Sequence, residues 1–155
     1  FFTVFAGGHR PILTLDATRV ALRTAINQCR MRFPFRIDAW VLLPEHLHCV
    51  WTLPAADHDH HRRWGEIKRV STHLMDQPGG PGPPCWQPGV HGRRLLDDAA
   101  CARHIDYVHF NPVRHGHVAH AIDWPWSSLH RYVGQGLCSA DWGRDVELAG
   151  DVESE

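Results

Sequence analysis

Two histidines separated by one residue, His46 and His48, have the type and spacing to do chemistry. They fall in a stretch that predicts a strand, and side chains alternate across a strand, so both imidazoles should project from one face about 7 Å apart. Two imidazoles on one face can bind one divalent ion. The chain has 14 histidines, and His58 and His60 repeat the spacing. Two surface histidines on a half-exposed strand are therefore the competing interpretation.

A second candidate is Tyr107, which precedes Asn111 by four residues near the end of a predicted helix. Residues i and i+4 share a helix face, so the two side chains should be neighbours. A phenol can attack phosphorus, and an amide oxygen is a suitable ligand for a hard metal ion. The only other tyrosine is Tyr132, so there are few alternative nucleophiles. On spacing alone, a tyrosine that merely packs its ring is the competing interpretation.

The elements that must position these residues follow from hydrophobic periodicity and from Gly and Pro punctuation. Strands are predicted at 1–5, 36–43, 46–53 and 90–96, and helices at 17–32, 62–76 and 98–110. Asp16 is the expected N-cap of the first helix, and Pro112 is expected to end the last one. This order predicts an α+β fold, a ferredoxin-like split βαβ antiparallel sheet with helices on one face and a C-terminal helical extension.

The composition predicts one globular domain at 1–140 and an acidic tail at 141–155. The tail holds six of the 17 acidic residues and one of the 16 basic ones, so residues 1–140 carry a net charge of +4 although the whole chain has −1. No apolar stretch approaches the 18 or so residues of a membrane span, so no membrane partner is expected. The five cysteines form no CxxC pair, which argues against a zinc knuckle and fits a reducing cytoplasm.

Several long motifs, in matching order, resemble the REP-associated tyrosine transposases. These enzymes belong to the His-hydrophobic-His single-strand nucleases and are related to small insertion-sequence transposases. The motifs are Ile37–Pro54, Trp64–Arg69, His104–Gly116 and Trp124–Tyr132. The resemblance covers most of residues 1–143.

The resemblance implies that His46 and His48 bind Mg²⁺ or Mn²⁺ and that Asn111 completes the ligand set. It implies that Tyr107 attacks a phosphate of single-stranded DNA, which leaves a 5′-phosphotyrosine link and a free 3′-hydroxyl. The implied substrate is a repetitive extragenic palindrome that forms a hairpin. The expected location is the bacterial cytoplasm, in association with the nucleoid. A monomer is expected, with a homodimer that exchanges tyrosines as the alternative.

Basic and aromatic side chains outside this set are expected to bind the DNA. Phosphate contacts are predicted for seven basic residues: Arg62, Arg63, Lys68, Arg69, Arg93, Arg94 and Arg114. A solvated helix face is the alternative for each of them. Stacking on unpaired bases is predicted for Trp64, Trp86 or His109.

The stretch Pro88–Arg93 departs from the family pattern, because relatives usually have a basic and aromatic run after Trp86-Gln87. This departure motivates a first alternative function, a DNA-binding protein of the same fold with weakened catalysis. The second alternative is a metal-dependent phosphoesterase that uses the two histidines without Tyr107.

Overall fold

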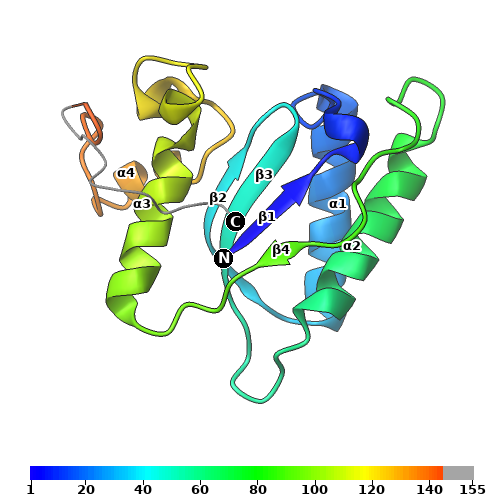
Figure 1. Cartoon of the computed structure of the whole chain (residues 1–155), viewed down its shortest axis with the longest axis horizontal. Helices are drawn as coiled ribbons and strands as arrows, with labels where there is room; N and C mark the ends of the chain where they lie inside the picture. Colours follow the sequence, from blue (N-terminus) through cyan, green and yellow to red (C-terminus); the bar gives the residue numbers. More distant parts are fainter. Residues whose placement is uncertain (145–155) are drawn as a thin grey trace.

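The computed structural model of the protein describes residues 1–144, which form a four-stranded antiparallel sheet flanked by helices (Figure 1). The strands are β1 (Phe2–Phe5), β2 (Arg36–Leu42), β3 (His46–Thr52) and β4 (His91–Gly92). Their order across the sheet is β2-β3-β1-β4, and every neighbouring pair is antiparallel. This is the split βαβ order that the sequence predicts.

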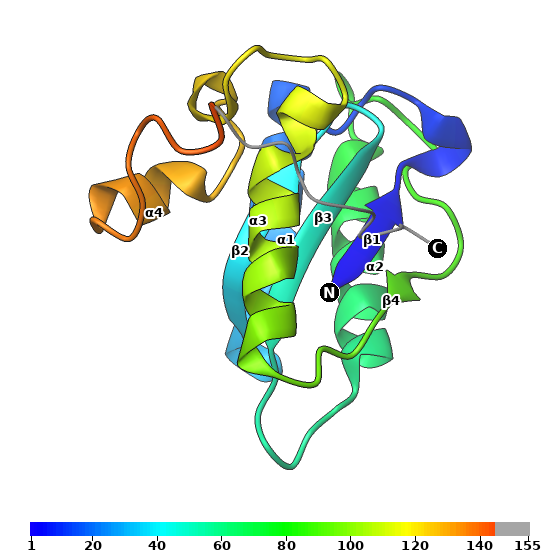
Figure 2. The same cartoon turned by 60° about the vertical axis from the view of Figure 1, so that its left-hand side comes forward.

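Helices cover both faces of this sheet. They are α1 (Asp16–Arg32), α2 (His60–Met75), α3 (Asp98–Arg114) and the short α4 (Leu129–Gly134). In Figure 2, α3 crosses in front of the sheet, whereas α1 and α2 lie behind it. The two helices of the ferredoxin-like core, α1 and α2, lie on one face as predicted, and the C-terminal extension places α3 on the other, so the predicted fold class is confirmed.

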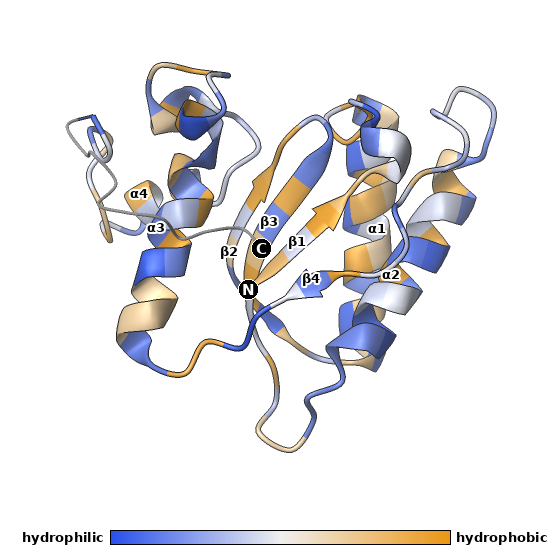
Figure 3. Ribbon diagram, viewed as in Figure 1, coloured by the Kyte–Doolittle hydropathy of each residue, from blue (hydrophilic) through white to orange (hydrophobic). Residues whose placement is uncertain are grey.

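The side chains of β3 alternate between two cores. Figure 3 shows that hydrophilic and hydrophobic residues both occur along this strand. Leu47 packs into the larger core with α1 and α2. Val50 packs against Val108 of α3 in the smaller core. His46 and His48 have the same parity as Val50, so they lie on the face that α3 covers. The sheet therefore separates the histidine pair from α1 and α2.

The start of α1 differs from the prediction. Leu15 occupies the N-cap position and makes no side-chain capping hydrogen bond, whereas Asp16 is the first helical residue. The Asp16 carboxylate instead pairs with Arg19, one turn further along the helix. An acidic residue in the first turn still interacts favourably with the helix dipole, so the helix starts where expected by a different local interaction.

The end of α3 is also a correction, because Pro112 lies inside the helix rather than beyond it. A proline in the last turn removes one backbone hydrogen bond. The helix continues past it, and the His115 N–H donates to the Asn111 carbonyl at 3.0 Å. The prolongation to Arg114 keeps Tyr107 and Asn111 on one unbroken helix.

The predicted fourth strand at 90–96 shrinks to the two residues of β4, which pair with Phe2 and Thr3 of β1. Gly89, shortly before this strand, has a φ of +76°, which is not an extended conformation. The Pro- and Gly-rich stretch before it, predicted to be irregular, contains no helix or strand. The sheet edge formed by β4 is therefore short.

The predicted acidic tail falls mostly outside the described residues, since it extends from 141 to 155 and the description ends at residue 144. Within residues 1–144, no helix has the length and apolar character to cross a membrane.

Candidate active site

The paired histidines of β3 are held in place by the strand register. His48 lies opposite Thr3 of β1, and the Thr3 hydroxyl forms a 2.9 Å hydrogen bond with Nδ1 of His48. Nδ1 of His46 lies 3.6 Å from a carboxylate oxygen of Glu45. The ring centroids of the two histidines are 4.8 Å apart. In His48 the Thr3 hydroxyl occupies Nδ1, which leaves Nε2 for a ligand.

Burial keeps both imidazoles neutral at neutral pH. His46 is 4% exposed and His48 is 2% exposed. Burial, followed by the proximity of His115, lowers the pKa of His46 to about 4. Burial lowers the pKa of His48 well below its ordinary value, and the neighbouring His46 adds to this effect. A neutral imidazole is the form that binds a metal ion, so this pair is electrostatically prepared for one.

Helix α3 brings the predicted tyrosine and asparagine to the same place. The Tyr107 ring lies 5.3 Å from the His48 ring and is 4% exposed. Asn111, fully buried one turn later, donates from Nδ2 to the Tyr107 carbonyl at 3.4 Å. Its Oδ1 is buried without a hydrogen-bond partner, although the side chain approaches His48. A buried acceptor without a partner is costly unless something binds it, so Oδ1 beside neutral imidazoles fits a cation.

A third histidine, His115, completes a cluster that was not predicted from the sequence. The ligand atoms of His46, His48 and His115 all lie within 4.8 Å of one another. His115 follows Tyr107 and Asn111 at successive intervals of four residues, and it occupies the C-cap of α3. Its side chain is exposed, but partial desolvation lowers its pKa as well. The four-residue spacing was a usable signal, but the expected end of the helix at Pro112 concealed it.

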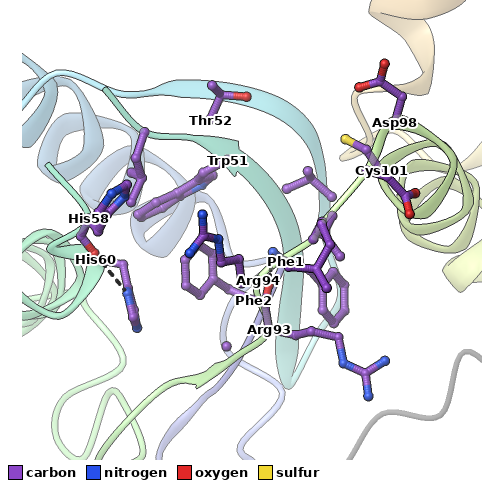
Figure 4. A pocket seen from close by; sticks show the side chains of 16 residues that line it. Phe1, Phe2, Trp51, Thr52, His58, His60, Arg93, Arg94, Asp98 and Cys101 are labelled. Carbon is purple, nitrogen blue, oxygen red and sulfur yellow. Dashed lines mark hydrogen bonds between the residues drawn. The ribbon is translucent and has the colours of Figure 1, made fainter. Parts of the chain in front are cut away.

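Three of the predicted DNA-binding residues lie near this cluster. The Arg114 guanidinium lies 5.4 Å from the centre of the Tyr107 ring. Arg93 and Arg94 line a pocket of about 610 Å³ that extends from Phe1, which stacks on His48, to the start of α3 (Figure 4). In Figure 4, the Arg94 side chain extends toward Trp51 and the Arg93 side chain extends in the opposite direction.

The other four basic residues belong to α2, on the opposite face of the sheet. Arg62 and Arg69 are exposed there. Arg63 is 1% exposed and donates to Asp57 and to backbone carbonyls, so the prediction that it contacts DNA is wrong: its side chain is used within the fold. Lys68 donates to the Gln87 carbonyl at 2.7 Å and thereby fastens the segment that leads into β4.

Two of the three predicted stacking residues are unavailable for that role. Trp64 is 1% exposed and stacks on Trp51 within the core. His109 is 2% exposed and shares a 2.8 Å hydrogen bond with Ser128. Trp86 is half-buried, and its indole N–H donates to the Ser71 hydroxyl. Aromatic spacing alone did not separate core residues from surface residues in this chain.

The arrangement places the Tyr107 ring beside His48, two neutral imidazoles next to each other, and an amide oxygen without a hydrogen-bond partner one turn further along α3. These are the residues that the resemblance to the REP-associated tyrosine transposases implies for the site. A comparison with models of protein families finds no match. Individual proteins do match.

A REP-associated tyrosine transposase of Escherichia coli K12 is 42% identical over 146 residues, which cover 94% of this chain and 85% of the relative. A Haemophilus influenzae relative assigned to the same type is 32% identical over 147 residues, which cover 84% of this chain and 80% of the relative. A solved structure of a REP-associated tyrosine transposase bound to a REP hairpin superposes with a TM-score of 0.83 at 39% identity, and the match covers 99% of this chain and 86% of that one. The chain belongs to the REP-associated tyrosine transposases.

Proposed function

We propose that this transposase cleaves and rejoins single-stranded DNA beside a hairpin of repetitive palindromic sequence, through a covalent bond to Tyr107. The observation that carries this proposal is the position of the Tyr107 ring, 5.3 Å from His48 and one helical turn from Asn111. The match to a transposase bound to a REP hairpin supports the choice of substrate.

In the proposed reaction, the Tyr107 oxygen attacks the scissile phosphorus as the phenol loses its proton. A bond forms between phosphorus and the tyrosine oxygen, the bond to the 3′ oxygen breaks, and a free 3′-hydroxyl leaves. Strand transfer is the reverse attack by another 3′-hydroxyl. The energy of the phosphodiester is retained in the 5′-phosphotyrosine bond, so the exchange needs no nucleoside triphosphate.

The ligands of a catalytic ion are proposed to be His46, His48 and Asn111. Neutral imidazoles and an unpartnered amide oxygen support this assignment. Bound Mg²⁺ or Mn²⁺ would polarise the scissile phosphate as a Lewis acid. Arg114, above the Tyr107 ring, is proposed to hold a phosphate oxygen next to the nucleophile.

Tyr107 acts in cis in this proposal, because the tyrosine lies beside the histidine pair of its own chain. A monomer is therefore the proposed active form, and a tyrosine-exchanging homodimer is the alternative that size-exclusion chromatography would reveal. The proposed site of action is the bacterial cytoplasm, at the nucleoid where the DNA lies.

Substitution of the nucleophile tests the proposal. Tyr107→Phe is expected to abolish the covalent protein–DNA adduct that the native chain forms with a hairpin oligonucleotide in Mg²⁺ or Mn²⁺, because only the attacking oxygen is removed. The adduct is measured as a shifted band on a denaturing gel. Tyr132→Phe is the matched control, since its hydroxyl donates to the Asp38 carbonyl at 2.9 Å and should be irrelevant to cleavage.

The short β4 motivates a second candidate, a DNA-binding protein that no longer cuts. It predicts hairpin binding by the native chain without an adduct. A phosphoesterase independent of the tyrosine would instead retain its hydrolytic activity in Tyr107→Phe. Either result would contradict the proposed reaction.

A further inference from the structure

We propose that His115 is a direct ligand of the ion held by His46 and His48, so that the site prefers a borderline transition ion of the Zn²⁺ type over Mg²⁺. This inference rests on the metal site of the proposed function and adds a residue that the family resemblance does not supply. With His115, the proposed ligand set consists of three imidazoles and an amide instead of two imidazoles and an amide.

The distances support a single shared ion. The ligand atoms of the three histidines lie within 4.8 Å of one another, and the His46 and His115 ring centroids are 5.0 Å apart. Nitrogens bound tetrahedrally to one ion at about 2.1 Å lie roughly 3.4 Å from each other. The site must therefore contract by about 1.4 Å at most. His115 has an exposed side chain at the end of α3, so rotation of that side chain can provide the contraction.

The backbone of α3 keeps His115 aimed at the strand. Its N–H donates to the Asn111 carbonyl at 3.0 Å, which closes the last turn. Tyr107, Asn111 and His115 are spaced at i, i+4 and i+8, so they share the helix face that packs on β3. One helix face thus carries the proposed nucleophile, the amide ligand and the third imidazole.

The neighbouring His117 offers a contrast within the same segment. Its ring stacks on Trp124 with centroids 5.1 Å apart, and it lies 6.2 Å from the His115 ring. It is not a member of the three-histidine cluster. The His117 ring instead packs on Trp124, so His117 is not expected to contribute to ion binding.

The donor set determines which ion binds best. Mg²⁺ prefers oxygen ligands and retains several of its waters. Imidazole nitrogen suits Zn²⁺, which is most often four-coordinate in proteins and can expand to five ligands in a catalytic site. Three imidazoles at one point therefore favour Zn²⁺, whereas a site of two imidazoles and an amide distinguishes the two ions less strongly.

Ion binding by the metal-free full-length chain tests this inference without any measurement of cleavage. Zn²⁺ affinity is measured by competition with a chromophoric chelator, and Mg²⁺ affinity by calorimetry. We expect His115→Ala to weaken Zn²⁺ binding about 100-fold, because the loss of a mere supporting partner already costs 10–100-fold. Mg²⁺ binding should stay within about 3-fold of native, since Mg²⁺ gains little from imidazole. His117→Ala is the matched control and should leave both affinities unchanged.

Nuclear magnetic resonance identifies the ligand directly, because Zn²⁺ should shift the ring nitrogen signals of His115 together with those of His46 and His48. Native Zn²⁺ affinity in His115→Ala, while His46→Ala loses both ions, would overturn the role of His115 and leave the metal site of the proposed function standing. Binding of neither ion by the native chain, or native affinities in His46→Ala, would overturn both.

Discussion

Polar side chains lie at Nδ1 of both histidines of the pair, and in His48 a hydrogen bond orients the ring. The Thr3 hydroxyl holds Nδ1 of His48, and the Glu45 carboxylate lies near Nδ1 of His46. Partners of this kind fix the tautomer and the ring orientation of a metal-binding histidine. The geometry of the proposed site therefore depends on residues other than the four that its motifs supply.

Removal of the Thr3 hydroxyl tests this dependence at the scale of one atom. Thr3→Val keeps the β-branched shape that a buried strand position favours, so the sheet should remain intact. Affinity for the divalent ion that His46 and His48 are proposed to bind is expected to fall about 10- to 100-fold, because His48 loses the partner that orients it. Calorimetry measures this affinity.

Thr18→Val is the matched control for this substitution. Thr18 is buried on α1, across the sheet from the site, and its hydroxyl has no hydrogen-bond partner. We expect native ion affinity in this variant. Equal ion affinity in Thr3→Val and Thr18→Val would show that the Thr3 hydroxyl has no role in orienting His48.

At the scale of elements, α2 is fastened to its surroundings by one buried arginine. Arg63 donates to the Phe33 and Pro34 carbonyls, which belong to the connection between α1 and β2. Its guanidinium also binds both carboxylate oxygens of Asp57, in the loop between β3 and α2. One side chain thus joins α2 to the loop that precedes it and to the α1–β2 connection, about 30 residues earlier in the chain.

The partnership between Arg63 and Asp57 makes the stability of the fold depend on pH. Hydrogen bonds from Arg63, and then from the Asp59 backbone, lower the pKa of Asp57 to about 2. Ionised Asp57 therefore stabilises the folded state at every pH above its unfolded pKa of about 3.9. That contribution is lost as the pH falls through about 2.

Asp57→Asn is accordingly expected to be less stable than the native chain at pH 7. The difference should be constant down to about pH 4, narrow below it, and vanish near pH 2. Urea unfolding midpoints of the two chains at pH 7, 5 and 3 measure it. A difference that remains the same at pH 3 as at pH 7 would contradict the role assigned to the ionised carboxylate.

At the scale of the whole molecule, the sheet divides the basic residues into two groups. Arg114 lies beside Tyr107, and Arg93 and Arg94 line the pocket that begins at Phe1, where Arg94 extends toward Trp51 and Arg93 away from it. Arg62 and Arg69 lie on α2, on the opposite face of the sheet from the histidine cluster. DNA that reaches Tyr107 must approach from the α3 side. The first group is therefore proposed to contact the cleaved strand.

This division predicts different salt dependences for hairpin binding. Replacement of Arg93 and Arg94 together by Ala should weaken binding at least about 10-fold and reduce the slope against salt by about two counterions. The corresponding double substitution of Arg62 and Arg69 should change the slope by less than about one. Fluorescence anisotropy between 50 and 200 mM salt measures both. A larger effect of the α2 pair would place the DNA on the helical face instead.

Local spacing in the sequence was sufficient to predict that His46 and His48 lie on one face of a strand and that Tyr107 lies one helical turn from Asn111. It was also sufficient to predict the split βαβ order. These features depend on the periods of strands and helices, which act over a few residues. The ends of the helices were predicted less well, because Pro112 lies within α3 and Asp16 is not the N-cap of α1. Both depend on interactions with residues that the local pattern does not include.

Only the tertiary structure decided which side chains meet. Whether Arg63 binds phosphate or its own fold depends on where α2 packs relative to the α1–β2 connection, and no spacing rule contains that information. Likewise, His115 joins His46 and His48 because α3 crosses the face of β3 that the other helices leave free. Residue types and periods determine what each side chain can do, whereas the packing of elements determines which of them act together, because burial and contact arise only between segments far apart in the chain.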